Sequence, residues 1–451
     1  MKTSLTKALL AILACAMLLC ACGQDPKPAD VISFDTDYPV EMKGTTFTAH
    51  NTFKTDYFRE DSSIFNKDLA LLTLSMCRCS TIDDAFATMG FDRQVKHVND
   101  ENDGINRCSY FFARRMVDDT ELVAVIITWC GYGMEWASNF TIGEKEEGER
   151  SDHVGFDETS EWLYGKLKSY IENICAGRQV KIWIGGYSRG ADLADCLTCK
   201  IIEREEINVH QSDLYAYALE ASRSIDAGYV QEYTCLHNFV INSDLFAAVP
   251  PASDAWGLER PGTSVVVSAI PDQINEYLAP ITGEEKSMPF SPDEEYQTPL
   301  EFLEYLFGIL LETGKDPIKD AASFRSRQAF YDTVQERVTY LLEVLMKNNK
   351  QGLWLLVDEI KKMGLSEKLE LLTEEGKLYT VTAKVLTDNN IKFDPDKLEN
   401  ACSLAFLFYS NDNISEDLVV LVASALDNLK YLALCHYPEV VYLILQHYGS
   451  N

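Results

Sequence analysis

The sequence predicts an α/β protein with a mostly parallel sheet that helices cover on both faces. The first observation is a series of short apolar runs, typical of strands buried on both faces, at 122–127, 180–185, 213–218 and 236–241. The second is helical periodicity between these runs, at 158–174 and 191–197. Strands that alternate with helices favour a parallel sheet, because the crossover helices have to lie over its faces.

The helical signal is stronger at both ends of this region. A helix is expected at 65–90, before the first strand of the parallel series. After about residue 290 the strand signal nearly disappears, and helices are expected at 300–311, 324–346, 353–363 and 418–434. The length of 451 residues allows two or three domains, or one large α/β unit with an insertion.

These shifts in character divide the chain into five predicted parts. They are a signal segment at 1–22, a tether and N-terminal segment at 23–60, an α/β core at 61–289, a helical insertion or cap at 290–430, and a C-terminal segment at 431–451 that returns to the core.

Composition excludes one class of partner. Hydrophobic residues make up 46% of the chain, which is typical of a globular protein with a substantial core. The formal net charge is −30, whereas nucleic-acid binding needs clustered lysine and arginine. We therefore expect no nucleic-acid partner, and the acidic excess by itself identifies no other.

The N-terminus has the features of an export signal. A basic start precedes an apolar stretch at 8–19 that is short for a membrane span. The following L-C-A-C-G segment at 19–23 resembles the end of a bacterial lipoprotein signal, which implies a diacylglyceryl anchor on Cys22. The resemblance implies an exported protein anchored to the bacterial cell membrane. The alternatives are an ordinary secretory signal cleaved near Ala21, or an uncleaved anchor.

Cysteine usage permits disulfides without requiring them. Three of the thirteen cysteines lie in or at the end of the signal segment, and the other ten would be exported. Most of those ten lie in apolar runs, where cysteine packs as a small hydrophobic residue. Cys196 and Cys199 form a C-x-x-C segment, but no second pair has zinc-like spacing, so helix-face packing is favoured over a metal or redox role.

The most informative motif is G-Y-S-R-G at 186–190. It lies between the apolar run at 180–185 and the helical segment at 191–197, the context that a nucleophile elbow requires. The turn is too tight for side chains at its flanking positions, which are both glycine. It would expose the hydroxyl of Ser188 at a helix N-terminus, so Ser188 is the candidate nucleophile.

The candidate acid is Asp244. It follows the apolar run at 236–241, at the carboxyl edge where the functional groups of an open α/β sheet gather. Aspartate is also common in turns and helix caps, which is the structural alternative for this residue. Asp226 and Asp254 are weaker candidates, because neither is placed at the end of that strand as a triad acid should be.

The candidate base is one of seven histidines. Three precede the serine, against the order Ser, Asp, His of this motif, namely His50, His97 and His153. His210 lies in a polar loop and His237 inside a strand. Pro438 can begin a helix, which would leave His436 at a junction from which it can reach across to a site. His447, near the end of the last helix, remains the alternative.

Three flanking segments give the chain a family resemblance. W-C-G-Y-G-M-E-W-A-S-N stands at 129–139, H-V-G-F at 153–156 before the serine strand, and D-L-F-A-A-V-P-P at 244–251. In this order and spacing, residues 110–265 resemble the class 3 lipases, the fungal-lipase-like α/β-hydrolases. The G-Y-G-x-E-W-x-S-N-F and G-Y-S-R-G-A segments look like those of a bacterial exported subgroup. The region 290–430 has no such counterpart.

The resemblance implies an α/β-hydrolase core and a membrane-anchored serine hydrolase that cleaves carboxylic esters, with lipid acyl esters as the expected substrates. Ser188, Asp244 and His436 would form the catalytic triad. The oxyanion would be held by the backbone N–H of Arg189, after the nucleophile, and of Tyr132 in an earlier loop. No metal or cofactor is implied, and the oligomeric state is not predicted.

The sequence departs from the family pattern in the loop that carries Tyr132. Cys130 stands where arginine is usual, and Tyr132 where threonine or serine is usual. Backbone donation survives both changes, but a side-chain contribution to the oxyanion is in question. The alternative function is therefore a catalytically weak or inactive envelope lipoprotein that uses the fold for binding. A peptidase or thioesterase on the same fold is a third. The helical region would serve as a lid or as a structural cap.

Overall fold

The computed structural model describes part of the chain. The described residues are 30–40, 45–100, 103–104, 106–128, 135, 138–139, 141–143, 148–242, 244, 246–247, 257–267, 337, 340–341, 344–345, 347–374, 376–403 and 435–449.

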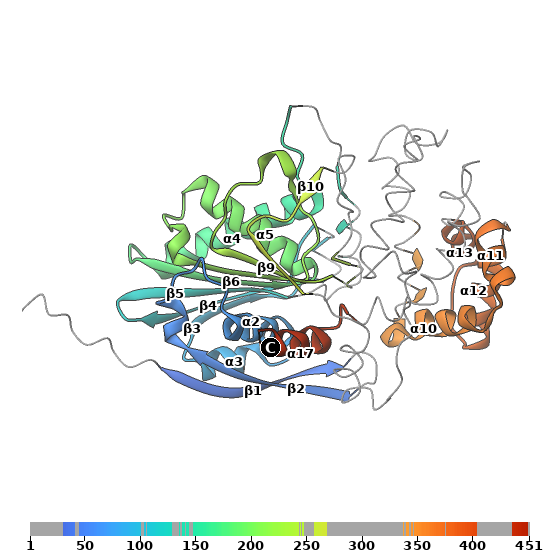
Figure 1. Ribbon diagram of the computed structural model, residues 1–451, viewed down its shortest axis with the longest axis horizontal. Helices are drawn as coiled ribbons and strands as arrows, with labels where there is room; N and C mark the ends of the chain where they lie inside the picture. Colours follow the sequence, from blue (N-terminus) through green and yellow to red (C-terminus); the bar gives the residue numbers. More distant parts are fainter. Residues whose placement is uncertain are drawn as a thin grey trace, which may run out of the picture.

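A mixed sheet of seven strands forms the centre of this described part (Figure 1). In spatial order its strands are β11 (Thr263–Val267), β9 (Leu236–Ile241), β7 (Leu214–Leu219), β6 (Val180–Tyr187), β5 (Thr120–Ile127), β4 (Tyr110–Val117) and β3 (Asp92–His97). The strands from β11 to β5 are parallel, and β4 and β3 add in antiparallel orientation. The four apolar runs in the sequence are all strands of this sheet. Its mostly parallel order, with helices, is consistent with an α/β-hydrolase fold.

Alternate side chains of the central strands face two different layers. On β6, Ile182 and Ile184 pack toward α4 (Val154–Ile174) and α5 (Arg189–Arg204). Trp183, between them in sequence, is fully buried on the opposite face. This alternation follows from the two-residue period of a strand, and it explains why β6 is mostly apolar: both of its faces are covered.

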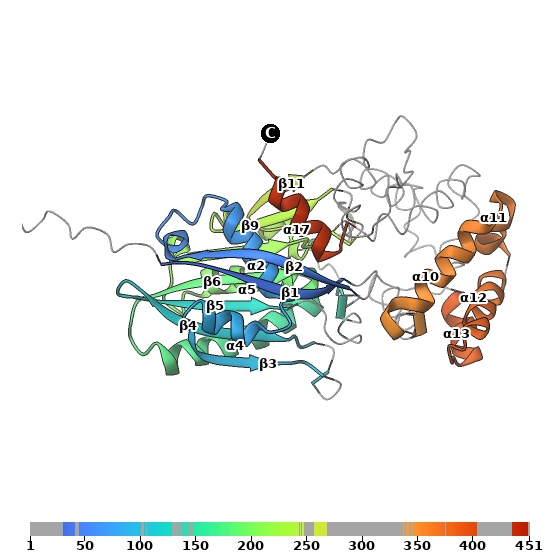
Figure 2. The same ribbon diagram turned by 90° about the horizontal axis from the view of Figure 1, so that it is seen from below.

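The opposite face is covered by elements from both ends of the chain. They are α2 (Lys67–Arg78), α3 (Ile82–Thr88), α17 (Pro438–His447) and the antiparallel strands β1 (Val31–Val40) and β2 (Thr45–Lys54). Figures 1 and 2 show α17 beside α2 on this face, the side of the sheet away from α4 and α5. The last described helix is therefore part of the α/β core, as expected for a chain that returns to it.

The single helix expected at 65–90 is wrong, because the structure has two helices there. Asn66 begins α2 by accepting a hydrogen bond from the Leu69 amide, at 3.1 Å. The chain leaves the helical conformation at Cys79, and the amide and hydroxyl of Ser80 both donate to the carbonyl of Asp37 in β1. This contact with a distant strand interrupts an otherwise helical pattern, and α3 begins at Ile82.

Shorter elements complete the core. A second small sheet pairs β8 (Ile225–Asp226) with β10 (Leu258–Glu259), and 3-10 turns occur at Thr55–Phe58, Gln211–Asp213 and Ala227–Tyr229.

Four further helices pack around an apolar cluster of their own (orange in Figure 1). They are α10 (Lys347–Lys362), α11 (Leu365–Thr373), α12 (Lys377–Asp388) and α13 (Pro395–Cys402). The helix expected at 353–363 corresponds to α10. The helices expected at 300–311 and 418–434, and most of 324–346, lie outside the described residues, as does the signal segment. The predicted division into five parts stays a prediction.

Within the described ranges, no helix combines the length and the apolar character needed to span a bilayer.

Candidate active site

Ser188 stands at a sharp turn between β6 and α5. Its backbone has φ 57° and ψ −132°, a conformation that residues other than glycine rarely adopt and that costs about 1–3 kcal/mol. The turn is held because the Ser188 amide donates to the Leu219 carbonyl at 2.9 Å. The strand, turn and helix expected around this serine are thus present, and the positive φ is the backbone conformation that a nucleophile elbow requires.

The glycines that flank the serine are required by close backbone contacts. A Cβ on Gly186 would lie 1.9 Å from the carbonyl oxygen of Gly190. A Cβ on Gly190 would lie 2.8 Å from the carbonyl oxygen of Ile127, at the end of β5. Neither neighbour is a flexible side chain that could move away, so both positions exclude larger residues.

Ser188 is hydrogen-bonded to His436, and His436 to Asp244. The Ser188 Oγ lies 2.7 Å from His436 Nε2, and His436 Nδ1 lies 2.5 Å from Asp244 Oδ2. The three residues come from the end of β6, the residue that follows β9 by a short turn, and the segment before α17. The structure therefore brings together the three side chains that the sequence singled out.

Burial fixes the direction of these hydrogen bonds. The Asp244 side chain is 0% exposed, and only 10% of the His436 side chain is exposed. The Asp244 carboxylate accepts from Nδ1–H, which leaves Nε2 as the acceptor for the Ser188 hydroxyl. The imidazole is then in the tautomer that can remove a proton from the serine.

The peptide and ring of His436 are held by neighbours on both sides. The Tyr187 hydroxyl donates to the His436 backbone carbonyl, and the Phe246 ring centroid lies 4.5 Å from that of the imidazole. Burial, reinforced by the charge of Asp244, raises the pKa of Tyr187 well above its ordinary value, so this phenol keeps its proton. Pro438 occupies the first turn of α17, as the sequence predicted.

The competing histidines have other contacts. His447 is exposed, and its Nδ1 lies 2.8 Å from the Leu443 carbonyl of its own helix. His237 is buried with Nε2 at 2.9 Å from the Ser62 carbonyl, and burial lowers the pKa of its imidazole. His153 Nε2 lies 2.9 Å from the Asn139 carbonyl. These contacts are structural, so the structure places His436, and not His447, at Ser188.

Of the two alternative acids, Asp226 and Asp254, only Asp226 is described, and its contacts lie elsewhere. Asp226 caps a turn, accepting from the amides of Gly228 and Ser151 at 2.9 Å each. Asp254 lies outside the described residues.

Of the two expected oxyanion donors, Arg189 and Tyr132, only Arg189 is among the described residues. Arg189 is the first residue of α5, so its backbone N–H belongs to the helix N-terminus that begins at Ser188. Tyr132 and Cys130 lie outside the described residues.

Sequence reasoning missed the role of the Arg189 side chain. The buried guanidinium donates to Ser138 Oγ at 3.0 Å and to Thr159 Oγ1 at 3.2 Å. It also lies 3.8 Å from the carboxylate of Glu135, which is buried as well. The residue after Ser188 therefore ties the turn at this serine to the E-W-A-S-N segment that follows Tyr132 in the sequence. The recurrence of both segments in the family pattern was the available signal.

Two more residues beside the site were missed, Tyr187 and Glu220. Tyr187 lies within the G-Y-S-R-G motif, but nothing in that motif indicates a contact with a residue as distant as His436. Glu220 is a charged residue at a strand end, and no local pattern points to its role.

The described cysteines and acids give no metal site. Cys196 and Cys199 form no disulfide and are buried in α5. Burial raises the pKa of both thiols well above the ordinary value, which makes them unreactive. Among the residues that the structure describes, no three His, Cys, Asp or Glu side chains are grouped to hold a metal ion.

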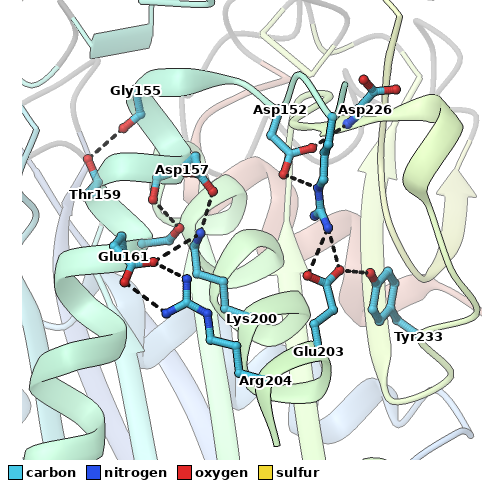
Figure 3. A network of polar contacts seen from close by, with 12 residues as sticks. Asp152, Gly155, Asp157, Thr159, Glu161, Lys200, Glu203, Arg204, Asp226 and Tyr233 are labelled. Atoms are coloured by element: carbon cyan, nitrogen blue, oxygen red, sulfur yellow. Dashed lines mark hydrogen bonds and ion pairs between the residues drawn. The ribbon is translucent and has the colours of Figure 1, made fainter. Parts of the chain in front are cut away.

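A charged cavity of about 720 Å³ is lined by residues of α4, of α5 and of the segment before α4. Figure 3 shows polar contacts among the side chains around it. Its lining is paired: Arg150 contacts Glu203 at 2.9 Å, Lys200 contacts Asp157 at 2.5 Å, and Arg204 contacts Glu161 at 2.9 Å. The pairs of Lys200 and Arg204 join α5 to α4, and the pair of Arg150 joins α5 to the segment before α4. We assign all three a structural role.

Comparison with known proteins gives a likeness of fold only. No family model matches the sequence, and a search of curated proteins finds no match. Solved structures match over 45% of this chain and 78% of theirs. One is the triacylglyceride lipase of Rhizomucor miehei, with 16% identity and a TM-score of 0.33. Another is a triacylglycerol lipase described as having a serine protease triad, with 18% identity and a TM-score of 0.34. A fungal lipase bound to an inhibitor has 15% identity and a TM-score of 0.34. At these TM-scores the likeness carries no weight for the chemistry at Ser188.

Replacing the first elbow glycine should destabilise the protein. In Gly186→Ala the new methyl group meets the Gly190 carbonyl, and we expect the free energy of unfolding to fall by about 1–3 kcal/mol. Gly165→Ala is the matched control, because its methyl group meets nothing within 4 Å inside α4, where alanine is favoured over glycine by about 0.5–1 kcal/mol. Urea unfolding followed by circular dichroism measures both. Equal stability of the two variants would contradict this account of the elbow.

Proposed function

We propose that the protein is a serine hydrolase that cleaves carboxylic esters through a triad of Ser188, His436 and Asp244. The observation that carries the proposal is the continuous hydrogen-bonded series from Ser188 Oγ to His436, at 2.7 Å, and from His436 to Asp244, at 2.5 Å. A strained serine at a strand-to-helix turn, with a buried histidine and acid in this order, has the geometry of nucleophilic acyl transfer.

Catalysis would proceed in two halves. His436 Nε2 takes the proton of Ser188 as Oγ attacks the acyl carbonyl, and Asp244 orients the ring and stabilises the imidazolium. His436 then gives that proton to the leaving alcohol, and the acyl group remains on Ser188. In the second half His436 takes a proton from water, the hydroxide attacks the acyl-enzyme, and Ser188 recovers its proton as the carboxylic acid leaves.

The oxyanion of each tetrahedral intermediate would be bound by the backbone N–H groups of Arg189 and Tyr132. Helix α5 begins at Arg189, so its N-terminal dipole favours negative charge beside Ser188. Loss of one such donor costs about a hundredfold or more in rate.

We propose lipid acyl esters as the substrate class and the bacterial cell membrane as the location of the enzyme. The support is the sequence resemblance of residues 110–265 to the class 3 lipases and the lipoprotein-like segment that ends at Cys22. A diacylglyceryl anchor on Cys22 would hold the exported enzyme at the bacterial membrane. The helical region at 290–430 would then cover the site as a lid or cap.

A second candidate function is a catalytically weak or inactive envelope lipoprotein that binds ligands through the same fold. The specific observation in its favour is the unusual pair Cys130 and Tyr132 in the oxyanion loop. The intact hydrogen bonds of Ser188 and His436 weigh against it.

Removing the nucleophile should abolish ester turnover. We expect Ser188→Ala to lower kcat/KM for a short-chain p-nitrophenyl ester by at least about 10³-fold, because no other group can form the acyl-enzyme. The matched control is Ser160→Ala, since the Ser160 hydroxyl donates only to the Asp157 carbonyl of its own helix, at 2.9 Å. Wild-type protein no faster than Ser188→Ala would refute the hydrolase and favour the binding function.

Tyr187 should affect the rate through the position of His436. In Tyr187→Phe the phenol that holds the His436 carbonyl is lost, and we expect kcat to fall about 10- to 100-fold with little change in KM. Tyr164→Phe is the control, because Tyr164 is also a buried tyrosine but lies on the opposite face of the sheet, within the α4 layer. Steady-state kinetics of both variants tests this, and equal rates would remove Tyr187 from the machinery.

A further inference from the structure

A second buried carboxyl group lies against Asp244. Glu220 directly follows β7, and the whole residue is only 1% exposed. Its carboxyl group is hydrogen-bonded to that of Asp244, which is 0% exposed. Two ionised carboxylates in contact within a dry site repel strongly, so a proton has to lie between them.

The backbone of both strands fixes the two acids in place. Both carboxyl oxygens of Glu220 lie 3.1 Å from the amide nitrogen of Ile241, the last residue of β9. The amide of Asp244 donates to the carbonyl of the same Ile241, at 2.9 Å. One residue at the end of β9 therefore aligns both side chains, and their contact does not depend on a flexible loop.

The backbone at Glu220 is also unusual. Its φ is 57°, a value that favours glycine, and its amide donates to the Phe239 carbonyl at 2.8 Å. A carboxyl-bearing residue thus occupies a strained position next to the nucleophile turn, since Leu219 accepts the hydrogen bond of the Ser188 amide. Strain of this kind is concentrated at functional sites.

The surroundings decide which acid holds the proton. Burial, and then the charge of Asp244, raise the pKa of Glu220 well above its ordinary value, while Arg260 acts in the opposite direction. The Arg260 guanidinium donates to the carbonyls of Ala221 and Ala247, so part of its donor capacity is already used. Tyr187 is a further titratable neighbour of the two acids, and it keeps its proton.

We propose that Glu220 is a positioning residue of the hydrolase, a neutral carboxylic acid that donates a hydrogen bond to Asp244 and holds this carboxylate toward His436. The inference rests on the proposed function, because it gives Glu220 a task within the triad. Through the donated bond Glu220 also disperses part of the negative charge that the imidazole faces.

Two replacements separate the donated hydrogen bond from mere packing. In Glu220→Gln the new amide is neutral, donates an N–H to Asp244 and accepts from Ile241, so this variant should keep kcat within about threefold of wild type. Glu220→Leu fills similar volume without a donor. We expect it to lower kcat about 10- to 100-fold, and to move the acid limb of the kcat/KM profile to higher pH by about one unit. The reason is that an undispersed Asp244 charge keeps the imidazole protonated further up the pH scale.

The experiment uses the full-length wild-type protein and both variants. For each, kcat/KM for a p-nitrophenyl ester is measured as a function of pH, and the His436 imidazole is titrated by ¹⁵N NMR. The NMR titration midpoint of the His436 ring should match wild type in Glu220→Gln and lie higher in Glu220→Leu, whether or not the ester turns over.

A shifted midpoint without turnover would refute the proposed function alone. An acid limb and midpoint unchanged in Glu220→Leu, or shifted equally in Glu220→Gln, would overturn the role of Glu220. If Glu220→Leu fails to fold, Glu220→Gln decides the role of Glu220. Lost activity or a shifted midpoint in Glu220→Gln would overturn that role, and wild-type values of both would support it.

Discussion

The hydrogen bond between His436 and Asp244 is the constraint on which the site depends, because it joins two segments 192 residues apart in the sequence. His436 can reach Ser188 only if the chain returns to the sheet after the helical region. That return is secured on the far face of the sheet, where α17 packs against α2 and the Tyr442 hydroxyl donates to the His50 carbonyl at 2.9 Å. The packing of α17 against the sheet therefore also sets the position of His436. A substitution in the buried surface of α17 is expected to move this histidine relative to Ser188.

The elbow supplies the complementary constraint. A Cβ at either flanking glycine would meet backbone carbonyls, so only glycine at these positions allows the strained turn of the serine. The parallel strands on either side hold that turn in register. The same sheet edge carries Glu220 and Asp244 at the ends of β7 and β9. Neighbouring parallel strands therefore bring Ser188, Asp244 and Glu220 close together at one edge of the sheet. Such convergence at the carboxyl edge is the general reason why open α/β sheets bear their sites there.

Much of this arrangement could be predicted from the sequence, wherever the signal was local. Strands such as β5 are continuous apolar runs because both of their faces are buried, and Pro438 marks the junction that positions His436. The break between α2 and α3 could not be predicted, because it depends on a hydrogen bond from Ser80 to a carbonyl in β1. Glu220 was missed for a similar reason: its partner lies on the neighbouring strand, and nothing in its own segment signals a positive φ.

If Ser188 is a nucleophile activated by His436, the purified protein should react with a fluorophosphonate at this serine, which mass spectrometry of the labelled peptides detects. We expect one phosphonyl group per chain, attached to Ser188, and labelling that is slowed at least about a hundredfold in His436→Ala, since the serine then lacks its base. Labelling at another residue, or equal rates in the wild type and the His436→Ala variant, would contradict it.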